Sequence, residues 1–281
     1  YVRIVAQGKG RARALSMAEA QEAMTLILSG NAAPEAVGAL LMVMRLRGET
    51  DAEIAGFTSA LRGSDGATLR PADLDWPCYA AGRTRGAPLF LLAAKLVANA
   101  GYTVSMHGWN SHQSTVANLR DAIGQSGLGG DGLRYDPLES LHPIAFELLG
   151  LRDTFGLRSC INTVLRMWNP SGAAASVQGV FHPSYRGLQS RAANLLGDKS
   201  LTVIKGGGGE FERNPAKQSA LFGLRDGCDL DASAPALINE NRRLNEPSQP
   251  IDLAALWAGD QGGDFAQATV IGTAALALWT V

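Results

Sequence analysis

Three segments of this chain carry residue types that bind anions or perform acid–base chemistry. The first runs from Cys78 to Pro88, contains Arg83 and Arg85 between glycines, and precedes an apolar stretch. Where a loop opens a helix, free backbone N–H groups and the helix dipole favour an anion, and arginines strengthen a phosphate site. The loop matches neither standard glycine-rich nucleotide pattern, so taken alone it also fits a surface turn with two solvated arginines.

The second segment is polar and holds two histidines between a predicted strand and a predicted helix. Its hydroxyl, amide and imidazole groups could bind an anion, and a histidine there could serve as a general acid or base. A plain polar loop is the alternative. Its tryptophan could provide a ring on which a nucleobase stacks. The candidate residues are His107, Gly108, Trp109, Asn110, Ser111 and Ser114.

The third segment has four consecutive glycines, flanked by Lys205 and Arg213. Glycines directly after a strand let the backbone approach a ligand closely, which favours a functional role over a merely flexible loop. Glu210 and Glu212 follow the glycines. They could hold Mg²⁺, which takes few carboxylates together with phosphate oxygens.

Further basic residues extend this pattern: Arg152, Arg158, Arg166 and Lys217. Residues 83–217 contain 14 Lys and Arg against 9 Asp and Glu, a balance of +5. The rest of the chain has 11 against 17, a balance of −6. This asymmetry predicts an anionic partner for the middle of the chain, with chance clustering as the alternative.

The composition bounds the class of protein. At 281 residues, 46% hydrophobic and 18% charged, the chain is long and apolar enough for a globular fold with a substantial core. Its apolar runs are too short to span a membrane, and its first residues show no signal-peptide plan. The three cysteines are widely spaced and form neither a disulfide framework nor a metal pattern, which predicts a cytoplasmic protein.

The positioning elements begin with three helices in residues 10–62. Ser16 with Glu19, and Thr50 with Glu53, form capping boxes, and Pro34 begins the middle helix. Apolar residues recur at helical spacing on one face of each. A polar linker follows over 63–71.

Strands then alternate with helices, which predicts a mostly parallel sheet with ligands at the carboxyl ends of its strands. The predicted strands are 76–80, 103–106, 176–181 and 201–204. The predicted helices are 89–100, 114–124, 186–196 and 266–280, and the segment 136–170 reads as helical. We therefore expect a helical domain over 1–64, completed by helices from about 136–160, and an α/β domain over 72–281.

The order of these features resembles a known family. The series runs from three capped helices through His107-Gly108-x-Asn110-Ser111 to a glycine-rich strand end. Between them, Arg152, Gly156, Arg158, Asn162, Asn169 and Pro170 form a close match in register. The chain resembles the anthranilate phosphoribosyltransferases and nucleoside phosphorylases of glycosyltransferase family 3, which have the class IV phosphoribosyltransferase fold. The resemblance implies an α/β fold with a small all-helical N-terminal domain and a central, mostly parallel sheet.

Departures from the family pattern fall on its phosphate and metal groups. The Gly-Thr-Gly-Gly-Asp loop is replaced by residues 81–86, which contain the two arginines, and the lysine before His107 is Met106. Of the family's Asp-Glu pair, one carboxylate remains as Glu210 and the other position is Phe211. The family's Gly-Pro becomes Leu165-Arg166. These exchanges would weaken a Mg²⁺–pyrophosphate site and suit direct contact with a phosphodiester backbone.

The pattern is similar to that of the YbiB-type members of this family. This resemblance implies a homodimer, formed through the helical domain, that binds DNA or RNA without sequence preference. We predict phosphate contacts by the basic residues named above, Lys205, Arg213 and Lys217 included, with no cofactor and no membrane partner. The alternative is an active pentosyl or phosphoribosyl transferase with an altered acceptor, not a functional anthranilate phosphoribosyltransferase. It would use phosphoribosyl pyrophosphate, with Glu210 holding Mg²⁺ and Arg152 the acceptor's carboxylate.

Overall fold

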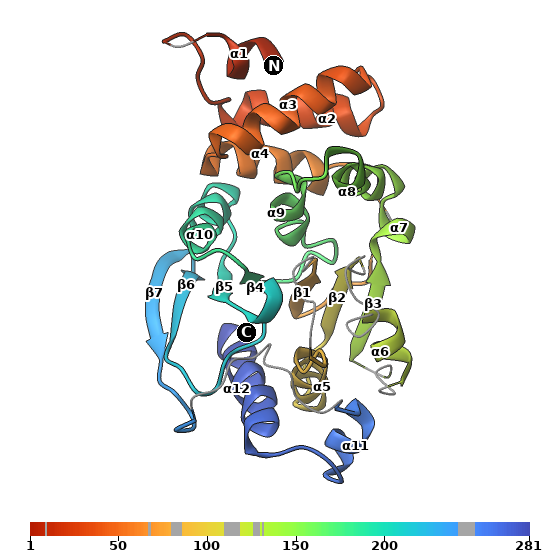
Figure 1. Cartoon of the computed structure of the whole chain (residues 1–281), viewed down its shortest axis with the longest axis vertical. Helices are drawn as coiled ribbons and strands as arrows, with labels where there is room; N and C mark the ends of the chain where they lie inside the picture. Colours follow the sequence, from red (N-terminus) through yellow and green to blue (C-terminus); the bar gives the residue numbers. More distant parts are fainter. Residues whose placement is uncertain are drawn as a thin grey trace.

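The chain folds into a helical bundle followed by a larger α/β part (Figure 1). This structure is a computed structural model that describes residues 1–8, 10–66, 69–79, 86–109, 119–125, 130, 132–240 and 251–281. The bundle comprises α1 (Val2–Ala6), α2 (Met17–Leu28), α3 (Pro34–Arg47) and α4 (Asp51–Arg62). The predicted fold class is confirmed by this arrangement and by the sheet that follows.

The bundle helices begin where their local signals predict. The Ser16 hydroxyl accepts a hydrogen bond from the Glu19 N–H (3.2 Å), and the Glu19 carboxylate accepts one from the Ser16 N–H (2.8 Å). Thr50 and Glu53 make the same reciprocal pair, and Pro34 occupies the first turn of α3. The three predicted helices are therefore confirmed, because each is specified by residues within a few positions of its own start.

A seven-stranded sheet forms the centre of the α/β part, in the order β3-β2-β1-β4-β5-β6-β7. The first five strands in sequence pair in parallel, and the last two form an antiparallel hairpin at one edge. The strands are β1 (Leu74–Cys78), β2 (Val104–Gly108), β3 (Leu133–Pro137), β4 (Ala175–Val180), β5 (Ser200–Lys205), β6 (Ser219–Arg225) and β7 (Cys228–Ala234). The predicted helical segment 136–170 is wrong at its start, where β3 ends, and the β6–β7 hairpin was not predicted.

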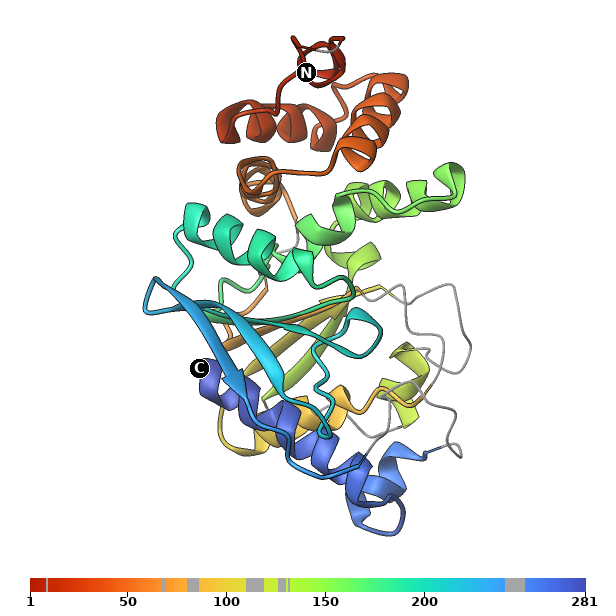
Figure 2. The same ribbon diagram turned by 60° about the vertical axis from the view of Figure 1, so that its left-hand side comes forward.

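Helices cover both faces of the sheet (Figure 2). They are α5 (Phe90–Asn99), α6 (Leu119–Gln125), α7 (Leu138–Leu141), α8 (Pro143–Phe155), α9 (Ile161–Arg166), α10 (Ser184–Leu196), α11 (Leu253–Ala258) and α12 (Asp264–Thr280). On one face α5 packs against α12; on the other, α10 lies between the sheet and α4. In the part of the chain that the structure describes, no helix is both long and apolar enough to cross a membrane.

Two hydrophobic cores lie on opposite faces of the sheet, as alternating strand residues require. In β5, Leu201 and Val203 face the bundle-side core, whereas Ile204 faces the core formed with α5 and α12. The Trp76 ring is fully buried in that second core and meets Phe211 edge-on, with 5.4 Å between ring centroids. The strand ends are thus anchored from both sides.

Arg62 joins the bundle to the α/β part. Its guanidinium donates to both carboxylate oxygens of Asp198 (2.7 and 2.9 Å) and to the Met167 and Trp168 carbonyls. A bidentate arginine–carboxylate pair is geometrically specific and only partly exposed here. This arginine clasp holds α4 against the segments that end α9 and α10.

Candidate functional site

The candidate site lies at the carboxyl edge of the parallel strands. There β1 leads into Tyr79, β2 into Trp109, β4 into Phe181 and β5 into the glycine-rich segment. The carboxyl ends of parallel strands meet at one edge, so segments far apart in sequence come together. Five predicted site residues lie outside the described residues: Arg83, Arg85, Asn110, Ser111 and Ser114.

A chain of buried hydrogen bonds crosses this edge. The Tyr79 hydroxyl contacts the His107 Nδ1 atom (2.8 Å), and the His107 Nε2 atom contacts the Asp75 carboxylate (3.1 Å). The Ser176 hydroxyl donates to the same carboxylate (2.8 Å). Because the Asp75 carboxylate accepts, the His107 Nε2–H is the donor, and Nδ1 accepts from the Tyr79 hydroxyl. Burial raises the pKa of the Tyr79 phenol well above its usual value. An imidazole engaged at both nitrogens fits a structural role, and its predicted phosphate contact stays a prediction.

Trp109 is partly buried against α8. Its ring meets the Phe146 ring edge-on, with 4.5 Å between centroids. The preceding residue, Gly108, lies so close to β1 that an added Cβ would be 2.1 Å from the Cys78 carbonyl oxygen. The glycine is therefore required by packing, and the tryptophan ring predicted to stack on a base already contacts a protein ring.

Four arginines converge beside this edge, three of which were predicted as site residues. Burial, and then repulsion by three other guanidinium groups, lowers the pKa of Arg158 to about 10. The arginine cluster comprises Arg158, Arg152, Arg166 and Arg45. Arg45 comes from α3 and was not predicted, because only the packing of the bundle brings it here. At neutral pH all four carry charge, and an anion would relieve their repulsion.

Arg166 is the most deeply buried member of the cluster. Its Nη2 atom donates to the Tyr79 carbonyl (3.2 Å) and would lie 3.6 Å from a Cβ added to Gly209. Burial lowers the pKa of this guanidinium, and the Glu210 carboxylate acts in the opposite direction. The guanidinium therefore sits between the end of β1 and the glycine-rich segment, beside the predicted metal ligand.

The glycine run folds back on its own chain. A Cβ on Gly206 would lie 1.6 Å from the Glu210 carbonyl oxygen, and one on Gly179 would lie 2.2 Å from the same atom. Gly208 and Gly209 have φ values of 64° and 92°, which side chains disfavour. The glycines thus permit a close approach, as the sequence predicts, but in the structure the approach is to this segment and to β4.

The acidic residues after the glycines are poorly arranged for Mg²⁺. Glu210 faces the Arg166 guanidinium, Phe211 is buried in the core, and the Glu212 carboxylate accepts a hydrogen bond from the Phe90 N–H (3.0 Å). Among the described residues, no group of three or more His, Cys, Asp or Glu could hold a metal ion. The described part of the site therefore does not fit the metal, because its carboxylates are engaged by the protein's own positive groups.

Replacing Glu212 with alanine is expected to reduce the free energy of unfolding by about 1–3 kcal/mol. The buried carboxylate lies at the N-terminal end of α5, where it accepts a hydrogen bond from the Phe90 N–H and meets the positive end of the helix dipole. Urea denaturation measures the loss. Glu212→Gln keeps an acceptor and should lose less; an equal loss in both variants would show that charge, not the hydrogen bond, matters.

Lys205 and Lys217 lie together at a second part of the edge. Both are exposed and line a pocket of about 710 Å³ that also includes Phe181, His182 and Arg186. The last three were not predicted, although they follow β4 as the other candidate segments follow their strands. Arg213, in contrast, is buried near α12 and donates to the Pro235 carbonyl, and it neither lines the pocket nor belongs to the arginine cluster.

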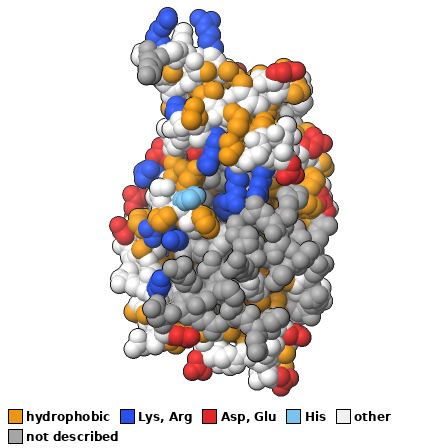
Figure 3. Space-filling model, in the orientation of Figure 1, with side chains coloured by type: hydrophobic (Ala, Val, Ile, Leu, Met, Phe, Trp, Pro, Cys, Tyr) orange, Lys and Arg blue, Asp and Glu red, His pale blue; other side chains and the backbone are white. Residues whose placement is uncertain are grey.

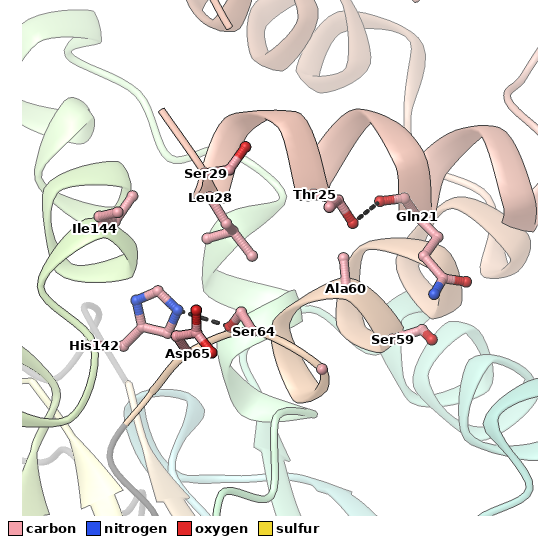
Figure 4. A pocket seen from close by; sticks show the side chains of 11 residues that line it. Gln21, Thr25, Leu28, Ser29, Ser59, Ala60, Ser64, Asp65, His142 and Ile144 are labelled. Carbon is pink, nitrogen blue, oxygen red and sulfur yellow. Dashed lines mark hydrogen bonds between the residues drawn. The ribbon is translucent and has the colours of Figure 1, made fainter. Parts of the chain in front are cut away.

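A smaller pocket of about 390 Å³ lies between α2, the end of α4 and the start of α8 (Figure 4). The His142 Nδ1 atom accepts from the Ala145 N–H (3.3 Å), so Nε2 carries the proton and donates to the Ser64 hydroxyl (2.8 Å). That hydroxyl donates to the Leu61 carbonyl (2.7 Å). The imidazole therefore is not a base for Ser64, and the pair holds α8 to the end of α4.

The protein is expected to lose stability as the pH falls below about 6.5, with His142 contributing. Burial lowers the pKa of this imidazole in the folded state, with Asp65 acting in the opposite direction. The unfolded chain therefore takes up the proton first. Urea denaturation near pH 7 and near pH 5.5 measures the difference, and His142→Asn, which keeps a helix-capping acceptor, should make the drop smaller. An unchanged drop in this variant would assign the pH dependence to other groups.

Comparison with known proteins gives the family. Residues 3–64 match the helical bundle domain of the glycosyl transferase family. The anthranilate phosphoribosyltransferase of Roseiflexus sp. (strain RS-1) is 32% identical over 238 residues, which are 77% of this chain and 67% of that protein. That of Symbiobacterium thermophilum is 30% identical over 245 residues, 80% of this chain and 69% of that protein.

Solved structures show the same fold. The anthranilate phosphoribosyltransferase of Thermus thermophilus superposes with a TM-score of 0.78 at 23% identity, over 95% of this chain and 86% of that one. The Saccharomyces cerevisiae enzyme in complex with PRPP and Mg gives 0.74 at 14% identity, over 99% and 86%. Sequence identity of 30% or more over two thirds of the relatives, together with this fold, means that the chain belongs to the family of the anthranilate phosphoribosyltransferases.

Proposed function

We propose that this phosphoribosyltransferase-like protein binds nucleic acid without sequence preference, through contacts to the phosphate backbone, and no longer acts as an anthranilate phosphoribosyltransferase. The observation that carries the proposal is the arginine cluster. Burial, and after it the charges of Arg152, Arg166 and Arg45, lowers the pKa of Arg158 to about 10, so a bound anion would stabilise the charged cluster. Arginine suits phosphate because its planar fork donates two parallel hydrogen bonds.

The surface around the cluster supports a polyanion rather than a single small anion. On the face shown in Figure 3, Lys and Arg side chains gather across the middle of the molecule, below the bundle and beside the undescribed residues. Asp and Glu side chains lie mainly towards the margins of this view. A basic band across an otherwise nearly neutral protein is the electrostatic footprint of a nucleic-acid-binding surface.

The loss of transferase function is supported by the internal use of the charged groups. Arg166 places a fixed positive charge beside Glu210, and Glu212 places a fixed negative charge at the start of α5. Phosphoribosyl pyrophosphate with Mg²⁺ would have to compete with both. We therefore propose that binding needs no cofactor.

Anisotropy of labelled oligonucleotides of unrelated sequence tests the function. We expect similar affinities among sequences, and a slope of log K against log salt of about −3 on duplex DNA for Arg45, Arg152 and Arg158, the cluster members that are not buried, between about 50 and 200 mM salt. The affinity falls because binding releases condensed counterions. Absence of binding at low salt, or a flat response, would contradict the proposal.

An active transferase with an altered acceptor is the competing function, since Arg152 and Glu210 persist at the site. Calorimetric titration with phosphoribosyl pyrophosphate plus Mg²⁺ separates the two. Saturable micromolar binding together with no nucleic-acid binding would favour the enzyme. Under this reading Glu210 would hold the metal, and the Arg166 guanidinium would have to move away from it.

We further propose that the protein is a homodimer formed through its bundle. Leu46 on α3 is 91% exposed and Leu26 on α2 is 38% exposed. A leucine this exposed costs hydration free energy in a monomer, which a second copy would recover.

A further inference from the structure

The pocket at the ends of β4 and β5 has a lining suited to an anion. Its volume is about 710 Å³, within the usual range of small-molecule sites. We call it the Phe181 pocket; it is lined by Phe181, His182, Pro183, Arg186, Lys205, Gly206, Gly207, Gly208, Asn214, Lys217, Gln218, Ser219 and Ala220. Four of these described lining residues are basic or histidine, and none is Asp or Glu. It shares no residue with the arginine cluster.

One cation of the pocket is held in place by the protein. The Arg186 Nε atom donates to the Pro183 carbonyl (3.2 Å), and its guanidinium lies over the Phe222 ring, 4.6 Å from the centroid. An arginine fixed in this way loses little further conformational entropy when it binds. The 13-residue helix α10 starts beside it, so the positive end of a helix dipole adds to the field of the side chains.

An aromatic ring stands among these cations. Phe181 is 48% exposed, and its ring meets the His182 ring edge-on with 5.0 Å between centroids. One face of an aromatic ring next to phosphate-binding cations is the arrangement on which unpaired bases stack. The glycine backbone of Gly206–Gly208 and the polar side chains of Gln218 and Ser219 complete the lining, where a ribose or a base edge could find hydrogen-bond partners.

We propose that the Phe181 pocket binds one nucleotide unit, with its base on the Phe181 ring and its phosphate on Lys205 and Lys217. The base must be unpaired, because a base inside a duplex has both faces covered by its neighbours. The pocket therefore gives the protein a preference for single strands that the arginine cluster alone would not produce. That the nucleotide belongs to a nucleic acid, and is not free, rests on the proposed function.

The ring is tested with Phe181→Leu, which removes the stacking surface but keeps apolar bulk at a half-exposed position. We expect about a tenfold loss of affinity for oligothymidylate and no change for duplex DNA. Tyr102→Leu is the matched control, since Tyr102 is 37% exposed and lies just before β2, at the amino ends of the parallel strands and not at their carboxyl ends. Equal losses for single strand and duplex, or no loss for either, would overturn the proposal.

The phosphate contact is tested with Lys205→Ala against Lys199→Ala. Both lysines are exposed and lie at opposite ends of the same strand, since Lys199 precedes β5 and Lys205 ends it. Only Lys205→Ala should weaken oligothymidylate binding and lower its salt slope, by about one unit. Equal effects of the two changes would mean that binding depends on general surface charge and not on Lys205 in the pocket, and would overturn the proposal.

Titration with thymidine monophosphate separates the sources of the nucleotide. If the oligomer binds at least 100-fold more tightly than the monomer, and both are weakened by Phe181→Leu, the pocket serves single-stranded nucleic acid. If monomer and oligomer bind equally, and both are weakened, it serves a free nucleotide and the proposed function fails while the pocket stands. If the wild type and Phe181→Leu bind both duplex and single strand equally well, the proposed function stands and the pocket is rejected.

Discussion

Replacing Arg152 and Arg158 together with glutamine is expected to weaken nucleic-acid binding by about 100-fold, because a hydrogen bond to a charged group contributes about 1.5–3 kcal/mol. The single change Arg158→Gln should leave the free energy of unfolding unchanged or higher, since burial and the neighbouring guanidinium groups both disfavour the charge of Arg158 in the folded state. Anisotropy with labelled DNA and urea denaturation give the two measurements. Opposite effects on binding and stability would mark the cluster as functional rather than structural.

The matched control is the replacement of Arg3 and Arg11 with glutamine. Both are exposed arginines of the N-terminal segment, so the net charge changes equally. We expect less than a threefold loss of affinity from this pair, through the general field alone. A loss as large as that of Arg152 and Arg158 would mean that binding follows net charge and that the cluster is not the site.

Gly206→Ala is expected to reduce the free energy of unfolding by about 3 kcal/mol or more, and the melting temperature by about 10 °C. The added methyl would lie 1.6 Å from the Glu210 carbonyl oxygen and 3.2 Å from the Glu212 backbone nitrogen. Backbone atoms cannot rotate away as a side chain can, so the glycine-rich segment would have to detach from the end of β5. Thermal unfolding followed by circular dichroism measures the shift.

Gly150→Ala is the control for this change. Gly150 lies within α8, and a Cβ there would meet nothing within 4 Å. Alanine favours a helix over glycine by up to about 1 kcal/mol, so this variant should be as stable as the wild type or more stable. If Gly206→Ala were equally harmless, the segment would not be packed against itself as the structure has it.

The bundle was predictable from sequence because its signals are local. Each capping box joins residues three positions apart, and the apolar spacing of each helix needs no knowledge of its neighbours. The β6–β7 hairpin was not predictable in this way, since a strand pair at a sheet edge depends on which strand it meets. The start of 136–170 was predicted as helix for the same reason: β3 is partly exposed and short, and it becomes a strand by pairing with β2.

The candidate site divides along the same line. Sequence patterns indicated which segments follow strands, and so indicated Lys205 and the glycine run, whereas Lys217 was named only as part of the basic middle of the chain. They could not indicate that Arg45 lies beside Arg158, or that Arg213 is buried under α12, because these placements depend on how the bundle and the last helix pack. They also could not say what the glycines approach. A glycine shows that some group can approach the backbone closely, but which segment of the protein does so depends on the whole fold.

The arginine clasp of Arg62 fixes the spacing of the two sites that a long ligand would contact. Arg45 belongs to the bundle and Lys205 to the sheet, and the clasp fixes these two parts against each other at Asp198. The distance between the arginine cluster and the Phe181 pocket is then fixed. A flexible single strand can bend until it reaches both sites. The conformational entropy lost on binding is therefore lost by the strand, and the protein surface does not have to rearrange.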